Sequence, residues 1–423
     1  MTVTPNNEGN IEQAHQLDSE ISRESKMLLS VKDLKTYFYT EEGVVKAVDG
    51  VSFNIYEDEV LGLVGETGCG KSVTALSIVR LVRSPGKILE GTILFNGANL
   101  LELTEEDMRG IRGNSITMIF QDPLNSLNPV ISVGDQLAEV FTLHQTEELR
   151  KILDERILSR KKNLERIKQF KKDLKEDDRL TKEDHELINK EIEDLKLSTK
   201  HIPNLNDMIQ EKSIKIIGEV GIADAKGILK RYPHELSGGM RQRVMIAMAL
   251  SCNPLMLIAD EPTTALDVTI QAQILDLMKD LKQRFKTSIL MITHDLGIIA
   301  DLCDRVAVMY SGNIVEYATA VDLFKNPRHP YTIGLISAIP SLEKKDKKLD
   351  VIRGMVPNLI YPPSGCRFHP RCDKRLEICD KVKPKFIEIR DKYFIACHLF
   401  DPKYRDSPKY QWEKEEKITS TLV

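Results

Sequence analysis

Short apolar runs alternate with stretches of helical spacing over most of residues 27–340. The strand-like runs lie at 28–40, 47–56, 59–65, 115–121, 255–260, 288–294 and 305–312. The stretches in which apolar residues recur at helical spacing lie at 72–82, 216–222, 235–252 and 269–285. An apolar run that enters a Gly-rich turn and then a helix begins a parallel α/β unit. The pattern therefore predicts an α/β fold built on a parallel sheet.

Residues 146–200 have a different composition from the rest of the chain. More than half of them are charged, with both signs nearly balanced, and neither Gly nor Pro occurs from Asp135 to Ile202. Apolar residues recur there at helical spacing: Leu153, Ile157, Leu164, Ile167, Leu174, Leu187, Ile192 and Leu195. A narrow apolar seam in a charged surface predicts two helices paired as a hairpin, with a turn near 176–181. We expect this segment to be an insertion that serves as a solvated spacer without activity.

The two ends of the chain have their own character. Residues 1–26 lack an apolar core and a cleavage site, so we expect a disordered polar leader and no signal peptide. Residues 341–423 are rich in Pro, Cys and His and predict a small separate module, with a frayed end over the last twenty residues. The α/β part is thus expected to span 27–340.

Composition excludes several classes of protein. The 423 residues include 60 Lys and Arg against 64 Asp and Glu, which gives a formal charge of −4. This balance rules out a nucleic-acid binder that relies on bulk positive charge. No apolar run reaches the length needed to cross a bilayer. Seven cysteines, an odd number, argue against a secreted disulfide framework and favour a reducing cytosolic compartment.

The segment 65–72 fits the phosphate-binding pattern G-x-x-x-x-G-K-[ST] in full. It consists of Gly65, Glu66, Thr67, Gly68, Cys69, Gly70, Lys71 and Ser72. Its glycines allow backbone N–H groups to surround phosphate oxygens at the positive end of the following helix. Lys71 is expected to bridge the β- and γ-phosphates, and the Ser72 hydroxyl is expected to bind Mg²⁺.

A second acidic element is expected to complete this site. The apolar run 255–259 ends at Asp260 and Glu261. Asp260 at the end of a strand is placed to hold Mg²⁺, directly or through water. Glu261 is then the candidate general base for the attacking water.

A second anion-binding helix terminus is predicted at 236–240. Ser237 is a favourable N-cap, and Gly238 and Gly239 leave backbone N–H groups uncovered at the helix start. One nucleotide does not need two γ-phosphate sites from the same chain. This suggests that the loop 65–72 and the helix start at 236–240 act on opposite partners, so that each nucleotide is bound by the loop of one chain and the helix start of another.

Together, residues 65–72, 236–240, 255–261 and His294 resemble the ATP-binding cassette (ABC) ATPases. The resemblance spans roughly 30–340 and implies a P-loop NTPase fold with an antiparallel β subdomain and a helical subdomain. It also implies a head-to-tail dimer that binds and hydrolyses ATP with Mg²⁺. Ser237 and Gly239 of one cassette would then close on ATP held by Lys71 and Ser72 of the other.

The same resemblance implies roles for four further residues. Gln121 corresponds to the loop that senses Mg²⁺ and the membrane partner, and His294 to the residue that contacts the γ-phosphate. Asp267 corresponds to the dimer-contact loop, and Phe38 to the aromatic residue that stacks on adenine. Met240 departs from the Gln that is commonest at its position, which casts little doubt on hydrolysis.

Local segments narrow the resemblance further. The segments at 120–129, 236–250, 326–340 and 365–372 are similar to the ATP-binding subunit of oligopeptide and dipeptide permeases. This implies an ATPase at the cytoplasmic face of the cell membrane, attached peripherally, that drives peptide import. The implied partners are two membrane-spanning permease subunits, a related second ATPase in a heterodimer, and an extracytoplasmic peptide-binding protein. No nucleic acid is expected.

Four cysteines near the C-terminus form a possible ligand set. Cys366, Cys372, Cys379 and Cys397 supply the four thiolates that a [4Fe–4S] cluster needs, and some members of the peptide-permease family carry one. Their spacing is looser than that of most zinc sites, so zinc is a weaker alternative and free thiols are a third. We expect the group to be structural or regulatory.

Two other functions are compatible with parts of the sequence. Chromosome- or ribosome-associated ABC ATPases insert coiled coils where residues 146–200 fall, but this insertion is short and its charge is balanced. In a redox-sensing adaptor, the cysteines would be the output and ATP would only hold the fold. Copurification distinguishes the first alternative, and turnover after Glu261→Gln distinguishes the second.

Overall fold

The computed structural model describes residues 26–121, 126–176, 181–201, 204–264, 266–338, 352–404 and 406–409. The predicted leader, apart from Lys26, and residues 410–423 of the predicted frayed end lie outside the described residues. The chain divides into two compact units. The sheet unit contains the residues up to Gln121 and from Pro254 onward, and the helical unit contains Asp122–Asn253.

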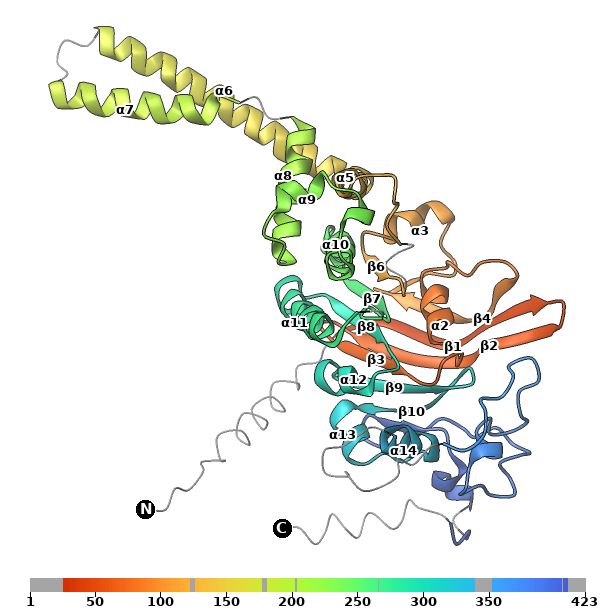
Figure 1. Cartoon of the computed structure of the whole chain (residues 1–423). Helices are drawn as coiled ribbons and strands as arrows, with labels where there is room; N and C mark the ends of the chain where they lie inside the picture. Colours follow the sequence, from red (N-terminus) through yellow and green to blue (C-terminus); the bar gives the residue numbers. More distant parts are fainter. Residues whose placement is uncertain are drawn as a thin grey trace, which may run out of the picture. The chain divides into compact units, whose positions relative to one another are not determined.

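The sheet unit is built on an eight-stranded sheet (Figure 1). Its order is β11 (Ile387–Arg390), β12 (Tyr393–Ile395), β10 (Asn313–Thr319), β9 (Arg305–Tyr310), β3 (Val60–Val64), β8 (Ser288–Ile292), β7 (Met256–Asp260) and β6 (Ile116–Ile119). The strands from β9 to β6 are parallel, and the strands from β10 to β11 are antiparallel. The parallel strands are buried apolar runs, as expected for a sheet covered on both faces. The predicted α/β fold is confirmed.

An antiparallel four-stranded sheet packs in the same unit. Its order is β2 (Gly43–Tyr56), β1 (Met27–Thr40), β4 (Gly86–Phe95) and β5 (Ala98–Asn99). The helices of the sheet unit are α2 (Lys71–Ile78), α3 (Glu105–Ile111), α11 (Val268–Phe285), α12 (Leu296–Leu302), α13 (Ala320–Lys325) and α14 (Pro330–Ser337). Helix α2 contacts β1, β2 and β7, so it joins the two sheets through one apolar core.

Helix α2 is shorter than the pattern over 72–82 predicts. It ends at Ile78, because Arg80 has a left-handed φ of 53° that interrupts the helix. The Arg80 guanidinium donates to the carbonyl oxygens of Leu100 and Leu103 at 3.0 and 2.6 Å. These long-range contacts explain why the apolar pattern alone overestimates the helix.

The helical unit contains α5 (Val133–His144), α6 (Thr146–Glu176), α7 (Lys182–Thr199), α8 (Leu205–Glu219), α9 (Ala225–Leu229) and α10 (Gly238–Leu250). Helices α6 and α7 lie side by side in Figure 1 and form the charged hairpin that the sequence predicts. Ile167 and Ile192 are buried in the seam between them, and Arg166 pairs with Glu191 at 2.7 Å. Thr181 caps α7, which places the start of the second helix where the turn is predicted.

The C-terminal segment does not stand apart as a separate module. Strand β12 pairs with β10 through Glu316–Ile395 and Tyr317–Phe394, and residues 352–409 belong to the sheet unit. The reason is that β10 would otherwise leave an unpaired edge, which β12 covers. Within the described residues, no helix combines the length and the apolar character needed to span a membrane.

Candidate functional site

The loop between β3 and α2 has a backbone that requires glycine. Gly68 and Gly70 have φ values of 80° and 108°, in the left-handed region. A Cβ on Gly70 would lie 2.2 Å from the carbonyl oxygen of Ala47, so no side chain fits there. Cys69 is buried in the same loop, and burial raises the pKa of its thiol, so Cys69 serves packing here. The loop therefore has the compact curve that brings backbone N–H groups around a phosphate.

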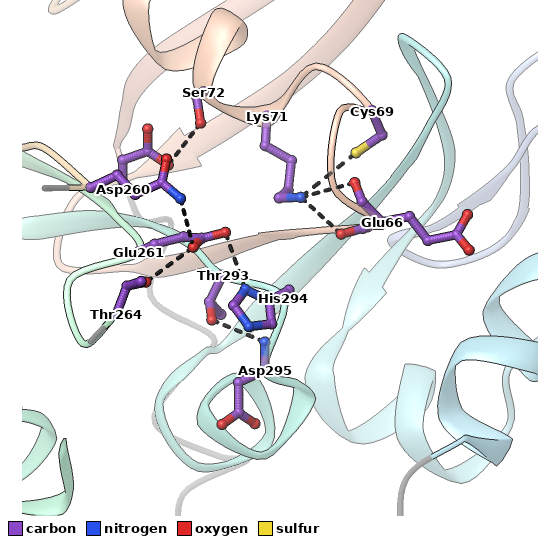
Figure 2. Close-up of polar contacts among 12 residues, drawn as sticks. Glu66, Cys69, Lys71, Ser72, Asp260, Glu261, Thr264, Thr293, His294 and Asp295 are labelled. Atoms are coloured by element: carbon purple, nitrogen blue, oxygen red, sulfur yellow. Dashed lines mark hydrogen bonds and ion pairs between the residues drawn. The ribbon is translucent and has the colours of Figure 1, made fainter. Parts of the chain in front are cut away.

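Lys71 begins α2, and its amine curves back over the loop (Figure 2). Its Nζ donates to the carbonyl oxygens of Gly65 and Glu66 at 2.8 and 3.1 Å. The residue is only 6% exposed. A buried ammonium group held against a glycine-rich loop supplies the positive charge that a triphosphate needs.

Ser72 and Asp260 lie close together although 188 positions separate them in the sequence. The Ser72 hydroxyl donates to Oδ1 of Asp260 at 3.0 Å. Burial raises the pKa of Asp260, and the hydrogen bond from Ser72 offsets part of that rise. A hydroxyl and a carboxylate at the carboxyl end of a parallel strand are oxygen donors that suit Mg²⁺.

Glu261 collects three polar contacts, which Figure 2 shows on both of its carboxylate oxygens. Gln121 Nε2 and the Thr264 hydroxyl each donate to Oε2 at 3.0 Å, and His294 Nδ1 lies 3.1 Å from Oε1. Burial acts to raise the pKa of Glu261, but the contacts with His294 and Thr264 outweigh it and lower that pKa below its ordinary value. The carboxylate is therefore charged and able to accept a proton from water.

The backbone at Glu261 is also unusual. Its φ is 50°, which a residue with a Cβ rarely adopts. The conformation is fixed by its own N–H, which donates to Ile292 O at 2.8 Å on β8. The turn after β7 thus directs the Glu261 carboxylate toward the ends of β6 and β8, from which Gln121 and His294 come.

Glu66 is held by residues far along the chain. Its carboxylate receives two bonds from the Arg371 guanidinium, at 2.6 and 3.0 Å. Its backbone N–H donates to the Tyr331 hydroxyl at 2.9 Å. Thr67, by contrast, is exposed at the tip of the loop.

The helical unit carries the predicted serine-capped helix. Ser237 is the N-cap of α10, and its hydroxyl accepts from the Met240 N–H at 3.4 Å. Ser237 and Gly238 are exposed, and Gly239 is partly exposed. The N-terminal backbone of α10 is therefore accessible to a partner.

Asp267 and Phe38 lie elsewhere in the sheet unit. Asp267 is exposed and caps α11 by accepting from the Ile270 N–H at 3.0 Å. Phe38 is half-buried on β1, where its ring packs beside Gly86 of β4. Neighbouring Tyr39 is 46% exposed, and the Lys87 ammonium lies 5.7 Å from its ring centre.

The four C-terminal cysteines do not form a metal site in this arrangement. Cys379 and Cys397 are buried, Cys366 and Cys372 are partly exposed, and all four are free thiols. Within the described residues, no group of three or more Cys, His, Asp or Glu side chains is arranged to hold a metal. Burial raises the pKa of Cys366 to about 12 and that of Cys372 to about 11, which favours neutral thiols over thiolates. The four thiols are thus not grouped as metal ligands in this structure, and a [4Fe–4S] cluster or zinc bound by them stays a prediction from the sequence.

Three residues at the site carry no prediction from the sequence. Thr264 follows Glu261 by three positions, so a search for local hydroxyl donors could have found it. Tyr331 and Arg371 reach Glu66 from 265 and 305 positions away, and no local pattern indicates either contact.

Comparison with known families agrees with this geometry. Residues 48–264 match the family described as ABC transporter. Residues 315–379 match the family described as oligopeptide/dipeptide transporter, C-terminal region. The two matches together extend from the antiparallel sheet to the cysteine-containing segment.

Several curated proteins are similar over most of the chain. The oligopeptide transport ATP-binding protein AppD of Bacillus subtilis is 44% identical over 375 residues, which cover 88% of this chain and 97% of that protein. The dipeptide transport ATP-binding protein DppD of the same organism is 42% identical over 375 residues, with 88% and 95% covered. The oligopeptide transport ATP-binding protein OppD of Escherichia coli is 42% identical over 362 residues, with 86% and 90% covered.

Solved structures show the same fold. The dimeric, post-hydrolysis structure of the ATP-binding cassette MJ0796, bound to ADP and Pi, aligns with a TM-score of 0.50 at 19% identity. The alignment covers 69% of this chain and 99% of that cassette.

Proposed function

Because the chain belongs to the ATP-binding proteins of oligopeptide and dipeptide ABC transporters, we propose that it is the ATPase subunit that powers import of short peptides. ATP hydrolysis follows from the family. The observation that carries the proposal for this chain is the meeting of Lys71, Ser72, Asp260 and Glu261 at the carboxyl ends of β3 and β7.

The proposed mechanism assigns one task to each side chain. Lys71 and backbone N–H groups of the loop 65–72, other than that of Glu66, hold the β- and γ-phosphates. Ser72, Asp260 and Gln121 would hold Mg²⁺, which would neutralise charge on the phosphates. Glu261 accepts a proton from the attacking water, and His294 contacts the γ-phosphate beside it. Phe38 stacks on the adenine.

The proposed assembly pairs two cassettes head to tail. Ser237, Gly238 and Gly239 at the start of α10 bind the γ-phosphate of ATP on the neighbouring cassette, and Asp267 lies at the dimer contact. ATP can bridge the two halves where ADP cannot, so ATP favours the closed dimer and hydrolysis reopens it. We propose a related second ATPase as the neighbouring cassette, which gives a heterodimer.

The proposed setting is the cytoplasmic face of the cell membrane. Two membrane-spanning permease subunits would receive the motion through the Gln121 region, and an extracytoplasmic protein would deliver the peptide. The names of the relatives support peptides as cargo. The thiols of Cys366, Cys372, Cys379 and Cys397 take no part in the proposed hydrolysis.

The alternative of a DNA- or ribosome-associated ATPase is not favoured. Residues 315–379 match the C-terminal region of oligopeptide and dipeptide transporters. A DNA- or ribosome-associated ATPase is not expected to contain this region.

Copurification and turnover test the proposal together. The full chain is solubilised from membranes, its companions are identified, and ATPase activity is measured with and without short peptides and the binding protein. Permease subunits and peptide-stimulated hydrolysis are the expected results. Ribosomes or nucleic acid in their place would overturn the transport function.

A further inference from the structure

Glu66 is the one acidic residue within the phosphate-binding loop 65–72. An acidic side chain beside a triphosphate site is unfavourable unless its charge is neutralised or directed elsewhere. Figure 2 shows the Glu66 carboxylate directed away from Lys71, whereas its backbone carbonyl faces the Lys71 amine. Something must keep the carboxylate in this outward orientation.

Arg371 supplies that constraint. Its two terminal nitrogens bind the two carboxylate oxygens of Glu66 as a bidentate pair. The Arg371 side chain is 6% exposed, and its Nε also donates to the Arg353 carbonyl at 3.0 Å. Such a planar fork fixes the direction of the carboxylate as well as neutralising its charge.

The backbone of Glu66 is fixed by the same part of the chain. Tyr331 of α14, which accepts from the Glu66 N–H, is fully buried. Its ring centre lies 4.6 Å from that of Tyr310 and 5.4 Å from that of Phe368. The Arg371 guanidinium lies 5.8 Å from the Tyr310 ring centre, so both contacts to Glu66 share one aromatic support.

Arg371 is itself held by a short, tightly bonded turn. Residues His369–Arg371 form a 3₁₀ helix, in which the Arg371 N–H donates to Phe368 O at 3.0 Å. The turn is anchored at its start by the Cys366 N–H, which donates to Cys379 O at 2.8 Å. The guanidinium is therefore preorganised, and Glu66 does not have to order a mobile side chain.

We propose that Arg371 is a positioning residue for nucleotide binding, which holds the Glu66 carboxylate away from the phosphates and fixes the loop that receives them. The inference rests on the proposed function, because it assumes that the loop binds MgATP. It assigns the C-terminal segment a direct part in the nucleotide site of the same chain. Without Arg371, the unpaired carboxylate is free to turn toward the triphosphate and repel it.

The test compares MgATP affinity among full-length variants. We expect Arg371→Gln to raise the Kd for MgATP about tenfold, since a charge-assisted bidentate pair is lost. Arg371→Lys should recover part of the affinity, because an ammonium keeps the charge but not the fork. The double variant Glu66→Gln/Arg371→Gln should bind more tightly than Arg371→Gln alone, because no carboxylate remains to repel the phosphates. In the assembled transporter, KM for ATP should rise while kcat stays within about twofold.

Arg390→Gln is the matched control. Arg390 lies in the same C-terminal segment and pairs with Asp322 at 2.5 Å, on a helix separate from the loop. It should leave the Kd unchanged. An unchanged Kd in Arg371→Gln, or an equal rise in Arg390→Gln, would overturn the role of Arg371 while leaving the ATPase intact. A wild-type chain that binds no MgATP would instead overturn the proposed function.

Discussion

The Ser72 hydroxyl lies 3.0 Å from the Asp260 carboxylate, although 188 positions separate the two residues in the sequence. Helix α2 begins one residue before Ser72, and β7 ends at Asp260, so each side chain leaves the end of a regular element. Their separation is therefore set by the packing of α2 against β7 rather than by a mobile loop.

This contact predicts that Ser72 and Asp260 both contribute to the affinity for Mg²⁺. Asp260→Asn should raise the Mg²⁺ concentration for half-maximal ATP hydrolysis about 10- to 100-fold, because one anionic oxygen donor is lost. A Mg²⁺ titration of ATPase activity measures the shift. Asp322→Asn, which changes an acid on α13, should not alter the titration; a normal Mg²⁺ requirement in Asp260→Asn would contradict the assignment.

Glu261→Gln should abolish turnover but preserve ATP binding. The amide keeps the size of the side chain but cannot accept the proton, so we expect hydrolysis to fall about 10²- to 10⁴-fold. Phosphate release and equilibrium binding of MgATP measure the two properties separately. Glu106→Gln, on the exposed first turn of α3, is the control. Turnover that survives in Glu261→Gln would contradict the role of Glu261 as the general base.

Ser237→Ala should reduce the ATPase activity of the transporter by more than the loss of helix stability from the missing N-cap can account for. Loss of an N-cap costs about 1 kcal/mol of helix stability. Thr181→Ala removes the cap of α7 and is the matched control for that cost. If Ser237 binds ATP across the dimer, Ser237→Ala lowers the ATPase activity of the complete complex and Thr181→Ala does not. Both variants should keep the wild-type affinity of the isolated chain for MgATP. Equal activities would rule out the phosphate contact.

The burial of His329 predicts that the free energy of unfolding decreases as the pH is lowered. His329 is fully buried, its Nδ1 accepts from the Tyr331 N–H at 3.1 Å, and burial lowers its pKa to about 3. Because the pKa is about 6.5 in the unfolded chain, the unfolded state gains a proton first as pH falls. The stabilising contribution of neutral His329 is complete above pH 6.5 and is lost progressively toward pH 3. The loss amounts to about 2 kcal/mol at pH 5.

Chemical denaturation at pH 7 and pH 5 measures this effect. Glu316 accepts from the backbone N–H of His329 at 3.1 Å, and burial raises its pKa, so it has the opposite dependence on pH. Comparison of wild type with His329→Asn isolates the histidine, because Glu316 is present in both. Parallel pH profiles for the two proteins would show that His329 does not titrate as described.

The α6–α7 hairpin should be dispensable for hydrolysis. Arg160 Nε donates to Thr199 O at 3.1 Å, so the two helices are already adjacent there. Removing residues 161–198 and joining Arg160 to Thr199 by a short Gly-Ser turn should leave ATPase activity within about twofold. Arg156 and Glu211, which pair at 2.9 Å outside the deletion, should be retained. A large loss of activity in a folded protein would show that the insertion does more than extend the helical unit.

Local patterns explain how much of the site could be predicted. Gly70, Lys71 and Ser72 lie within one contiguous motif, and Asp260 ends an apolar strand, so their chemistry is visible in the sequence. The contact of Arg371 with Glu66 depends on how distant elements pack. No spacing or composition carries that information.

The same distinction applies to the fold. The buried strands β3, β7 and β8 are continuous apolar runs and could be predicted as such. Strands β11 and β12 are only four and three residues long, and their alternation is too short to detect. The end of α2 at Ile78 depends on bonds from Arg80 to a distant loop, which the helical pattern does not contain.

The pairing of β12 with β10 changes where this protein can be shortened. A fragment that stops near residue 340 would keep every phosphate-binding residue but would leave the main-chain groups of β10, such as the Val315 carbonyl that accepts from Ala396 N–H at 2.9 Å, without partners. An unpaired edge strand can form backbone hydrogen bonds with the edge strand of another chain. Such a fragment would therefore be prone to aggregate. By pairing with β10, the segment that contains β12 protects the sheet edge from association with other chains, independently of the chemistry of its cysteines.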